Sequence, residues 1–180
     1  MRGRLAVWIA APVLVMMLGL IVVLATSDPA TDREASSPLL GRQAPPIVGE
    51  SIEGEAFDLA DHSGKFVLVN VFATWCTPCI QEHPELVEFE ERHSAAGDAT
   101  VVSIVFDDKV EEVRKFFDRF GGDWPVLADA DGRISLSYAV AKVPESYLIA
   151  PDGTVISKLT GGVTSSGLER ILSEAKEAIR

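Results

Sequence analysis

Cysteine and histidine are scarce in this chain, which has only two cysteines and three histidines among its 180 residues. A structural zinc site takes four ligands, and one cysteine pair with His62, His83 and His93 offers no spacing that completes such a set. Covalent haem attachment needs a histidine directly after the second cysteine of a CxxC motif, and Ile80 stands there. The sequence therefore predicts neither a bound metal nor a haem at the cysteines.

Basic residues are also few, since 16 Lys and Arg against 27 Asp and Glu give a formal net charge of −11. Nucleic acids and anionic lipid surfaces attract clustered basic side chains, so neither is expected to bind the folded part of the chain. Hydrophobic residues make up 47% of the sequence and its glycines and prolines are dispersed, as in a globular protein. The length allows one domain with a short appendage.

The first 24 residues differ in kind from the rest. The run from Leu5 to Leu24 has no charged residue, and a helix of that length spans roughly the 30 Å hydrocarbon layer of a membrane. Arg2 and Arg4 precede the run, which predicts one transmembrane helix with a cytoplasmic amino terminus and the rest of the chain outside. A cleaved signal peptide is the alternative, because small residues at 23–25 suit a signal peptidase. Either interpretation exports the rest of the chain.

The remainder divides into a linker and one domain. Residues 26–44 are rich in Ser, Pro, Asp and Ala, so we expect a flexible linker between an anchor over residues 1–25 and a domain over residues 45–180. The elements expected in this domain are an additional hairpin over 47–59, strands over 66–72 and 101–106, helices over 78–93 and 110–120, a hairpin over 146–159 and a helix over 165–179. Their order is that of an α/β domain with a thioredoxin-like fold. The helix over 110–120 is expected to bury Val113, Phe116, Phe117 and Phe120.

Both cysteines belong to one motif, Trp75-Cys76-Thr77-Pro78-Cys79, placed where an apolar strand is expected to give way to a helix. Residues three apart in a first helical turn lie about 5–6 Å apart, a separation that a disulfide spans. At a helix amino terminus the unpaired N–H groups and the dipole favour a thiolate, so Cys76 is the predicted nucleophile and Cys79 the deeper, resolving cysteine. A purely structural disulfide is disfavoured because so short a loop removes little chain entropy.

This motif, with an apolar anchor ahead of it and Val143-Pro144-Glu145 about 65 residues later, resembles the thioredoxin-like oxidoreductases of cytochrome c maturation, the ResA, TlpA and CcmG group. The resemblance runs from about Pro45 to the end of the chain. It implies that the peptide bond before Pro144 is cis, beside the disulfide, and that the backbone of Val143 binds a partner chain in an extended form. The alternative for a Val-Pro pair is an ordinary loop.

Two acidic residues are candidates for proton transfer on the strength of this resemblance. Glu82 follows Cys79 by three residues and matches an acid of ResA-like members, and Glu145 follows the proline as in CcmG-like members. A carboxyl held in a poorly solvated place near the sulfurs would have a raised pKa and could exchange a proton with Cys79. The alternative for Glu82 is a solvated helix position.

The surface around the motif is expected to meet the partner through Trp75, Thr77 and Pro78, with Trp75 shielding the nucleophile. Lys142 either adds positive potential near the nucleophile or is simply solvated. The residues that remain have structural interpretations: Asp107 and Asp108 are expected to end a strand and cap the next helix, and His83 is more readily structural than a metal ligand.

The resemblance implies a monomeric, membrane-anchored enzyme with no cofactor other than its redox-active disulfide, Cys76–Cys79. Its target would be the disulfide of apocytochrome c, with electrons supplied through the membrane by a donor of the CcdA or DsbD type. A general extracytoplasmic oxidant or isomerase, and a metallochaperone or redox sensor, remain alternatives, because residue types do not determine the direction of electron flow. A peroxide reductase is disfavoured, because its Pro-x-x-x-Thr-x-x-Cys pattern is absent ahead of Cys76.

Overall fold

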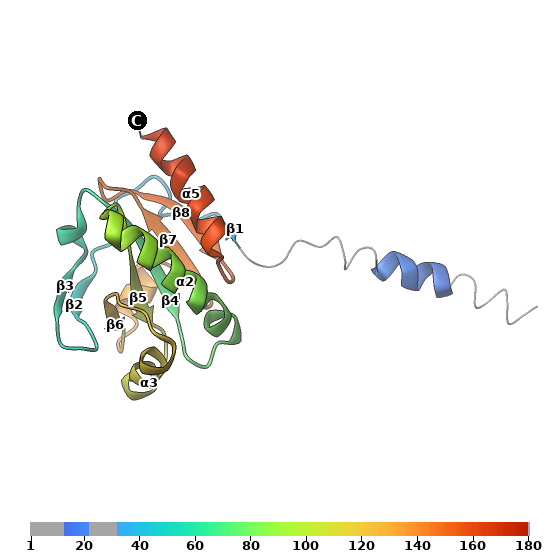
Figure 1. The fold of residues 1–180 in the computed structure, drawn as a ribbon, viewed down its shortest axis with the longest axis horizontal. Helices are drawn as coiled ribbons and strands as arrows, with labels where there is room; N and C mark the ends of the chain where they lie inside the picture. Colours follow the sequence, from blue (N-terminus) through green and yellow to red (C-terminus); the bar gives the residue numbers. More distant parts are fainter. Residues whose placement is uncertain (1–12, 22–31, 180) are drawn as a thin grey trace, which may run out of the picture.

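The computed structural model describes residues 13–21 and 32–179. Residues 32–179 are built around a six-stranded mixed sheet with the order β1-β8-β7-β4-β5-β6 (Figure 1). Its strands are β1 (Arg33–Glu34), β4 (Phe66–Phe72), β5 (Ala99–Val105), β6 (Val126–Ala128), β7 (Glu145–Ile149) and β8 (Val155–Thr160). A second sheet pairs β2 (Val48–Glu50) with β3 (Ala56–Asp58). The helices are η1 (Leu59–His62), α2 (Thr77–Ala96), α3 (Val110–Phe120), α4 (Arg133–Ser137) and α5 (Ser165–Ala178).

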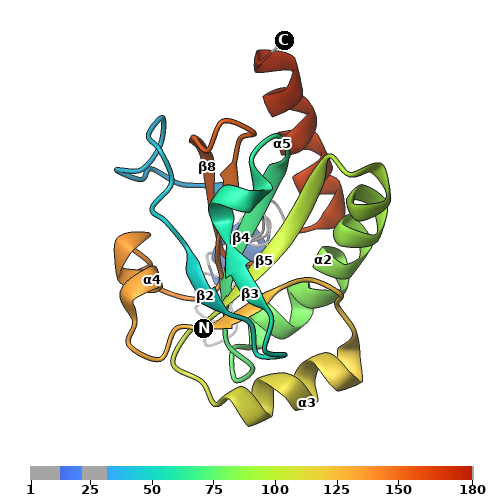
Figure 2. The same cartoon turned by 90° about the vertical axis from the view of Figure 1, so that its left-hand side faces the viewer.

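Strand β4 lies at the centre of the sheet, parallel to β5 and antiparallel to β7. Successive side chains of a strand point to opposite faces, and all seven of β4 are buried, so both of its faces must be covered. Leu68 packs into a core with α2, α3 and α5, whereas Val69 packs into a second core with the β2–β3 hairpin and the loop after α4. Figure 2 shows the resulting layers, with α2 and α5 on one side of the sheet and α4 and the hairpin on the other.

The predicted alternation of strands and helices is confirmed, including the additional hairpin before β4. Four short elements escaped prediction, β1, η1, β6 and α4, because each has five residues or fewer, too few for a periodic pattern to emerge. The prediction that Phe120 faces the core is wrong. It is the last residue of α3, its side chain lies against the ring of Phe116 with the guanidinium of Arg119 over it, and 45% of its surface is exposed.

The folded part of the chain begins before the predicted boundary at Pro45. Strand β1 pairs with β8, and the Gly41 N–H donates to the carbonyl of Val155 at 2.9 Å. Residues 32–44, predicted to belong to a flexible linker, therefore lie along β8. They give hydrogen-bond partners to the backbone of its outer edge, which would otherwise have no partner strand.

The predicted membrane anchor lies largely outside the described residues, as does the linker over residues 26–31. Residues 13–21 form an exposed helix. In the described ranges 13–21 and 32–179, no helix has both the length and the apolar character that crossing a bilayer requires.

Candidate active site

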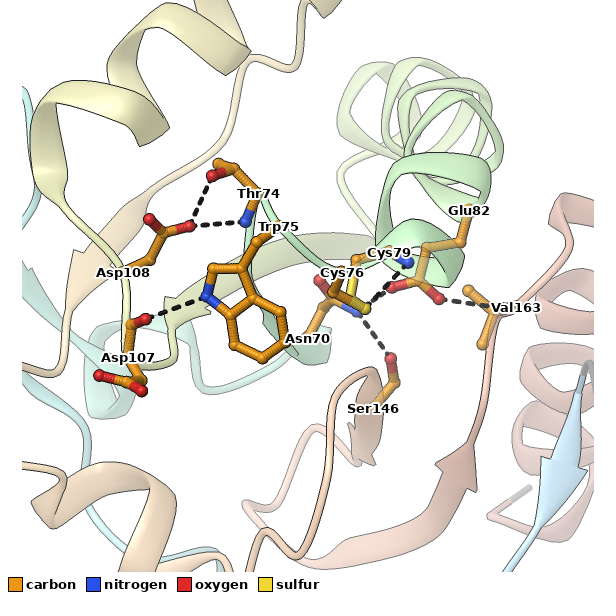
Figure 3. Close-up of a disulfide and its surroundings, with 10 residues drawn as sticks. All are labelled: Asn70, Thr74, Trp75, Cys76, Cys79, Glu82, Asp107, Asp108, Ser146 and Val163. Atoms are coloured by element: carbon orange, nitrogen blue, oxygen red, sulfur yellow. Dashed lines mark hydrogen bonds between the residues drawn. A yellow bond between two sulfur atoms is a disulfide. The ribbon is translucent and has the colours of Figure 1, made fainter.

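Cys76 and Cys79 form a disulfide at the amino terminus of α2, with their Cα atoms 5.2 Å apart (Figure 3). Cys76 is the N-cap residue of the helix, and its sulfur accepts a hydrogen bond from the Cys79 N–H at 3.3 Å. The first turn of α2 carries no acidic side chain, so the positive end of the helix dipole acts on this sulfur without local compensation. The geometry favours a thiolate at Cys76 once the disulfide is reduced.

The turn that leads into the disulfide is held by the loop between β5 and α3. Both the N–H and the hydroxyl of Thr74 donate to one carboxylate oxygen of Asp108 at 2.6 Å, and the indole N–H of Trp75 donates to the Asp107 carbonyl at 3.0 Å (Figure 3). The prediction that these aspartates cap the next helix is wrong: Lys109 is the N-cap residue of α3 and makes no side-chain cap bond. Asp107 and Asp108 instead position the residues directly before Cys76.

Exposed side chains surround a disulfide that is itself buried. The exposed fraction is 5% for Cys76 and 2% for Cys79, so the predicted resolving cysteine is the more deeply placed of the two. Trp75 is 58% exposed, although its indole N–H is bonded, and Thr77 and Pro78 are exposed as well. The three residues predicted to form the partner-binding surface are therefore exposed beside the buried disulfide.

The peptide bond between Val143 and Pro144 is cis, as predicted. Val143 is partly buried and precedes the first residue of β7, so its backbone lies outside the hydrogen-bond ladder of that strand. Glu145 is paired with Val71, which places Pro144 opposite the end of β4, where the turn to the cysteines begins. Lys142 is exposed in the same loop.

Glu82 is buried one helical turn after Cys79, on the same face of α2. One carboxylate oxygen accepts from the Asn70 side-chain amide at 2.9 Å and the other from the Val163 N–H at 3.0 Å (Figure 3). Burial raises the pKa of this carboxyl group to about 8, against the opposing effect of the two hydrogen bonds. The alternative of a solvated helix position is therefore wrong for Glu82.

Two further side chains of this network were not predicted. The Asn70 amide also donates to the Ser146 hydroxyl at 3.1 Å, which links β4, β7 and α2 behind the disulfide. Asn70 is the only polar residue in the run from Phe66 to Phe72, and a lone amide inside a buried strand is a signal that could have identified it. Ser146 carries no comparable signal in its local sequence.

Glu145 occupies a different environment from Glu82. It precedes Ser146 in β7, so its side chain points to the opposite face of the sheet. There its carboxylate pairs with the Lys158 ammonium at 2.9 Å and accepts from the Tyr147 hydroxyl at 3.2 Å. The structure thus separates the two predicted acids, and only Glu82 shares a hydrogen-bond network with the disulfide side of β4.

Replacing Lys158 alone with methionine is expected to lower the free energy of unfolding by roughly 3–5 kcal/mol, because the Glu145 carboxylate would stay buried without its cation. The double replacement Glu145→Gln with Lys158→Met is expected to recover most of this loss, since it buries no unpaired charge. Urea unfolding of the single and double variants measures both effects. A Glu145→Gln chain that kept full stability but lost exchange activity would instead assign Glu145 to the chemistry.

The structural interpretation of His83 is confirmed. Its ring nitrogen Nε2 lies 2.8 Å from the Gly121 carbonyl, and its ring packs against Phe116, Phe117 and Trp124. Burial lowers its pKa, so the ring is neutral and donates to that carbonyl. Within the described part of the chain, no group of three or more His, Cys, Asp or Glu residues could hold a metal ion.

A CxxC disulfide at the start of the helix after the central strand, with a cis-proline at the adjoining strand, defines a thioredoxin-fold protein of thiol–disulfide exchange. The family model described as Redoxin matches residues 39–175. The chain belongs to the Redoxin family and, within it, to the TlpA/ResA/CcmG-like group of thiol–disulfide oxidoreductases.

Individual relatives agree with this placement. The chain is 33% identical over 135 residues to the thiol-disulfide oxidoreductase ResA of Bacillus thuringiensis subsp. konkukian, an alignment that covers 75% of this chain and 78% of the relative. It is 33% identical over 138 residues to the thiol:disulfide interchange protein CycY of Rhizobium leguminosarum bv. viciae, covering 76% and 72%. The crystal structure of a thioredoxin-family thiol:disulfide interchange protein from Chlorobium tepidum is 26% identical, with a TM-score of 0.69 over 78% of this chain and 99% of that one.

Proposed function

We propose that this oxidoreductase works outside the cytoplasmic membrane as a reductant, and that its target is the disulfide of apocytochrome c. The observation that carries the proposal is the buried Glu82 carboxyl group one turn behind Cys79. Reduction of a partner is complete only when the second cysteine has lost its proton, and Glu82 provides an acceptor for it. The similarity to ResA and CycY supports a place in cytochrome c maturation.

The reaction transfers two electrons from the dithiol to the partner. The Cys76 thiolate attacks one sulfur of the partner disulfide, forms a mixed disulfide and releases the other partner sulfur as a thiolate. Cys79 then gives its proton to the Glu82 carboxylate, and its thiolate attacks the Cys76 sulfur, so that the second partner sulfur leaves. The proton transfer from Cys79 to Glu82 costs little free energy, because the two pKa values are close: about 8.5 for an ordinary thiol and about 8 for buried Glu82.

A reductant outside the membrane needs a supply of electrons, because the exterior is oxidising. The predicted helix over residues 5–24 would hold the domain against the membrane, where a transmembrane donor of the CcdA or DsbD type could reduce the Cys76–Cys79 disulfide. Residues 25–31 separate the predicted helix from Asp32, the first described residue of the domain, and seven residues reach at most roughly 25 Å. The exposed Trp75, Thr77 and Pro78 then serve both donor and target.

The test combines a reduction potential with partner trapping. We expect a potential nearer to the roughly −270 mV of thioredoxin than to the roughly −120 mV of a strong oxidant. The Cys79→Ser chain, expressed in a host that matures c-type cytochromes, is expected to trap apocytochrome c as a mixed disulfide. The double variant Cys76→Ser with Cys79→Ser is the control that traps nothing. An oxidising potential together with a broad set of trapped secreted proteins would point to a general oxidant or isomerase.

A further inference from the structure

Three consecutive backbone N–H groups where α5 begins each donate to a carboxylate from a different position. Val163 donates to Glu82 at 3.0 Å, Thr164 to Asp32 at 2.8 Å and Ser165 to Glu85 at 2.8 Å. We call residues 163–165 the carboxylate-binding turn. Two of these carboxylates belong to α2, whereas the third belongs to Asp32, the first residue of the described range 32–179, directly before β1.

Asp32 fixes the turn on both sides of Val163. Its own N–H donates to the Gly162 carbonyl at 2.9 Å, and its second carboxylate oxygen accepts from the Thr164 hydroxyl at 2.6 Å. The fit is close at Gly167, where an added Cβ would lie 2.2 Å from the carboxyl carbon of Asp32. The absence of a side chain at Gly167 is therefore what allows Asp32 to reach the turn.

We propose that Asp32 is a positioning residue of the redox site: it holds the carboxylate-binding turn so that the Val163 N–H meets Glu82, and its negative charge faces that group. The proposal rests on the proposed role of Glu82 as proton acceptor for Cys79. It also connects the amino-terminal segment to the acid of the site, because Asp32 and Glu82 accept hydrogen bonds from neighbouring residues of the same turn.

The charges around Glu82 agree with this assignment. Its direct partners on β4 and in the turn, the Asn70 amide and the Val163 N–H, are uncharged. Glu85 lies one turn further along α2, and with Glu82 it lines a pocket between α2 and residues 161–164. The charge of Asp32 adds to burial in raising the pKa of Glu82. With the Asp32 carboxylate in place, Glu82 keeps its proton to higher pH. A substitution that removes or displaces this carboxylate lets Glu82 ionise at lower pH.

The decisive experiment is a titration of Glu82 in the full-length chain, followed by carbon-13 NMR of its carboxyl group, with the signal assigned by Glu82→Gln. Asp32→Asn keeps an oxygen acceptor for Thr164 but removes the charge, and is expected to lower the midpoint by roughly half a pH unit. Gly167→Ala, which displaces the carboxylate and leaves Asp32 in the chain, is expected to shift it in the same direction. Asp61→Asn, a charge change at an exposed position of η1, is the matched control and should leave the midpoint unchanged.

Hydrogen exchange separates a local effect from a loss of fold. The Val163 and Thr164 amides are expected to exchange about tenfold faster in Gly167→Ala, while amides of β4 keep their protection. Equal midpoints for Asp32→Asn and Asp61→Asn, or a uniform rise in exchange across the domain, would overturn the proposal. If Glu82→Gln leaves thiol–disulfide exchange unchanged, the proposed function fails, yet the shift of the Glu82 titration in Asp32→Asn still decides the positioning role on its own.

Discussion

Replacement of Cys79 by serine is expected to let the protein attack a partner disulfide but not release it, so that the mixed disulfide with Cys76 accumulates. Replacement of Cys76 is expected to abolish turnover, by at least roughly a thousandfold, because loss of a nucleophile removes the whole reaction path. The asymmetry follows from position: only Cys76 is the N-cap residue of α2 and accepts the hydrogen bond from the first turn. Stopped-flow reduction of a fluorescent disulfide peptide, with mass spectrometry of the product, measures both results.

The Ser94→Ala chain is a matched control for these two variants, because it changes an exposed side chain near the end of α2 and leaves both sulfurs and the surface around them in place. It is expected to keep turnover within a few-fold of the parent chain. Accumulation of the mixed disulfide on Cys79 in the Cys76→Ser chain would reverse the assignment of nucleophile and resolving cysteine.

Replacement of Glu82 by glutamine is expected to slow resolution of the mixed disulfide by roughly a hundredfold at pH 8, a typical loss for a general base. In the parent chain this rate should rise with pH as Glu82 ionises, with a midpoint near its pKa of about 8, and the glutamine variant should lack that rise. The Glu90→Gln chain is a matched control, since Glu90 is a buried acid of the same helix that bonds to Thr100 and Val101. A pH profile unaltered by Glu82→Gln would exclude Glu82 from the reaction.

The same carboxyl group predicts how stability changes with pH. Burial raises the pKa of Glu82 from 4.5 to about 8, so the folded chain holds a proton that the unfolded chain has already lost. Below about pH 4.5 Glu82 does not reduce the free energy of unfolding. The loss grows as pH rises and is complete above about pH 8, at up to roughly 4–5 kcal/mol. Urea unfolding of the oxidised chain at pH 5 and at pH 8 should therefore show a larger loss of stability for the parent than for Glu82→Gln.

Much of the site was predictable because its signals are local. The run from Phe66 to Phe72 is buried on both faces, as its apolar character predicts, and the cysteines that follow it begin a helix. The cis bond before Pro144 was inferred from the resemblance. The two acids show where such inference ends: the same reasoning nominated Glu82 and Glu145, and the structure places them on opposite faces of the sheet, with different partners.

The sequence by itself determined the chemistry of the protein: two cysteines three residues apart at a helix start, since spacing and dipole depend only on neighbouring residues. The tertiary structure alone decided which of the two predicted acids lies on the cysteine side of the sheet. Glu82 is hydrogen-bonded to Asn70, 12 residues away in the sequence, and to Val163, 81 residues away. Thr164 is hydrogen-bonded to Asp32, 132 residues away. The protonation of a buried group depends on solvent exclusion and on partners that only the folded chain brings together, and no local pattern encodes either.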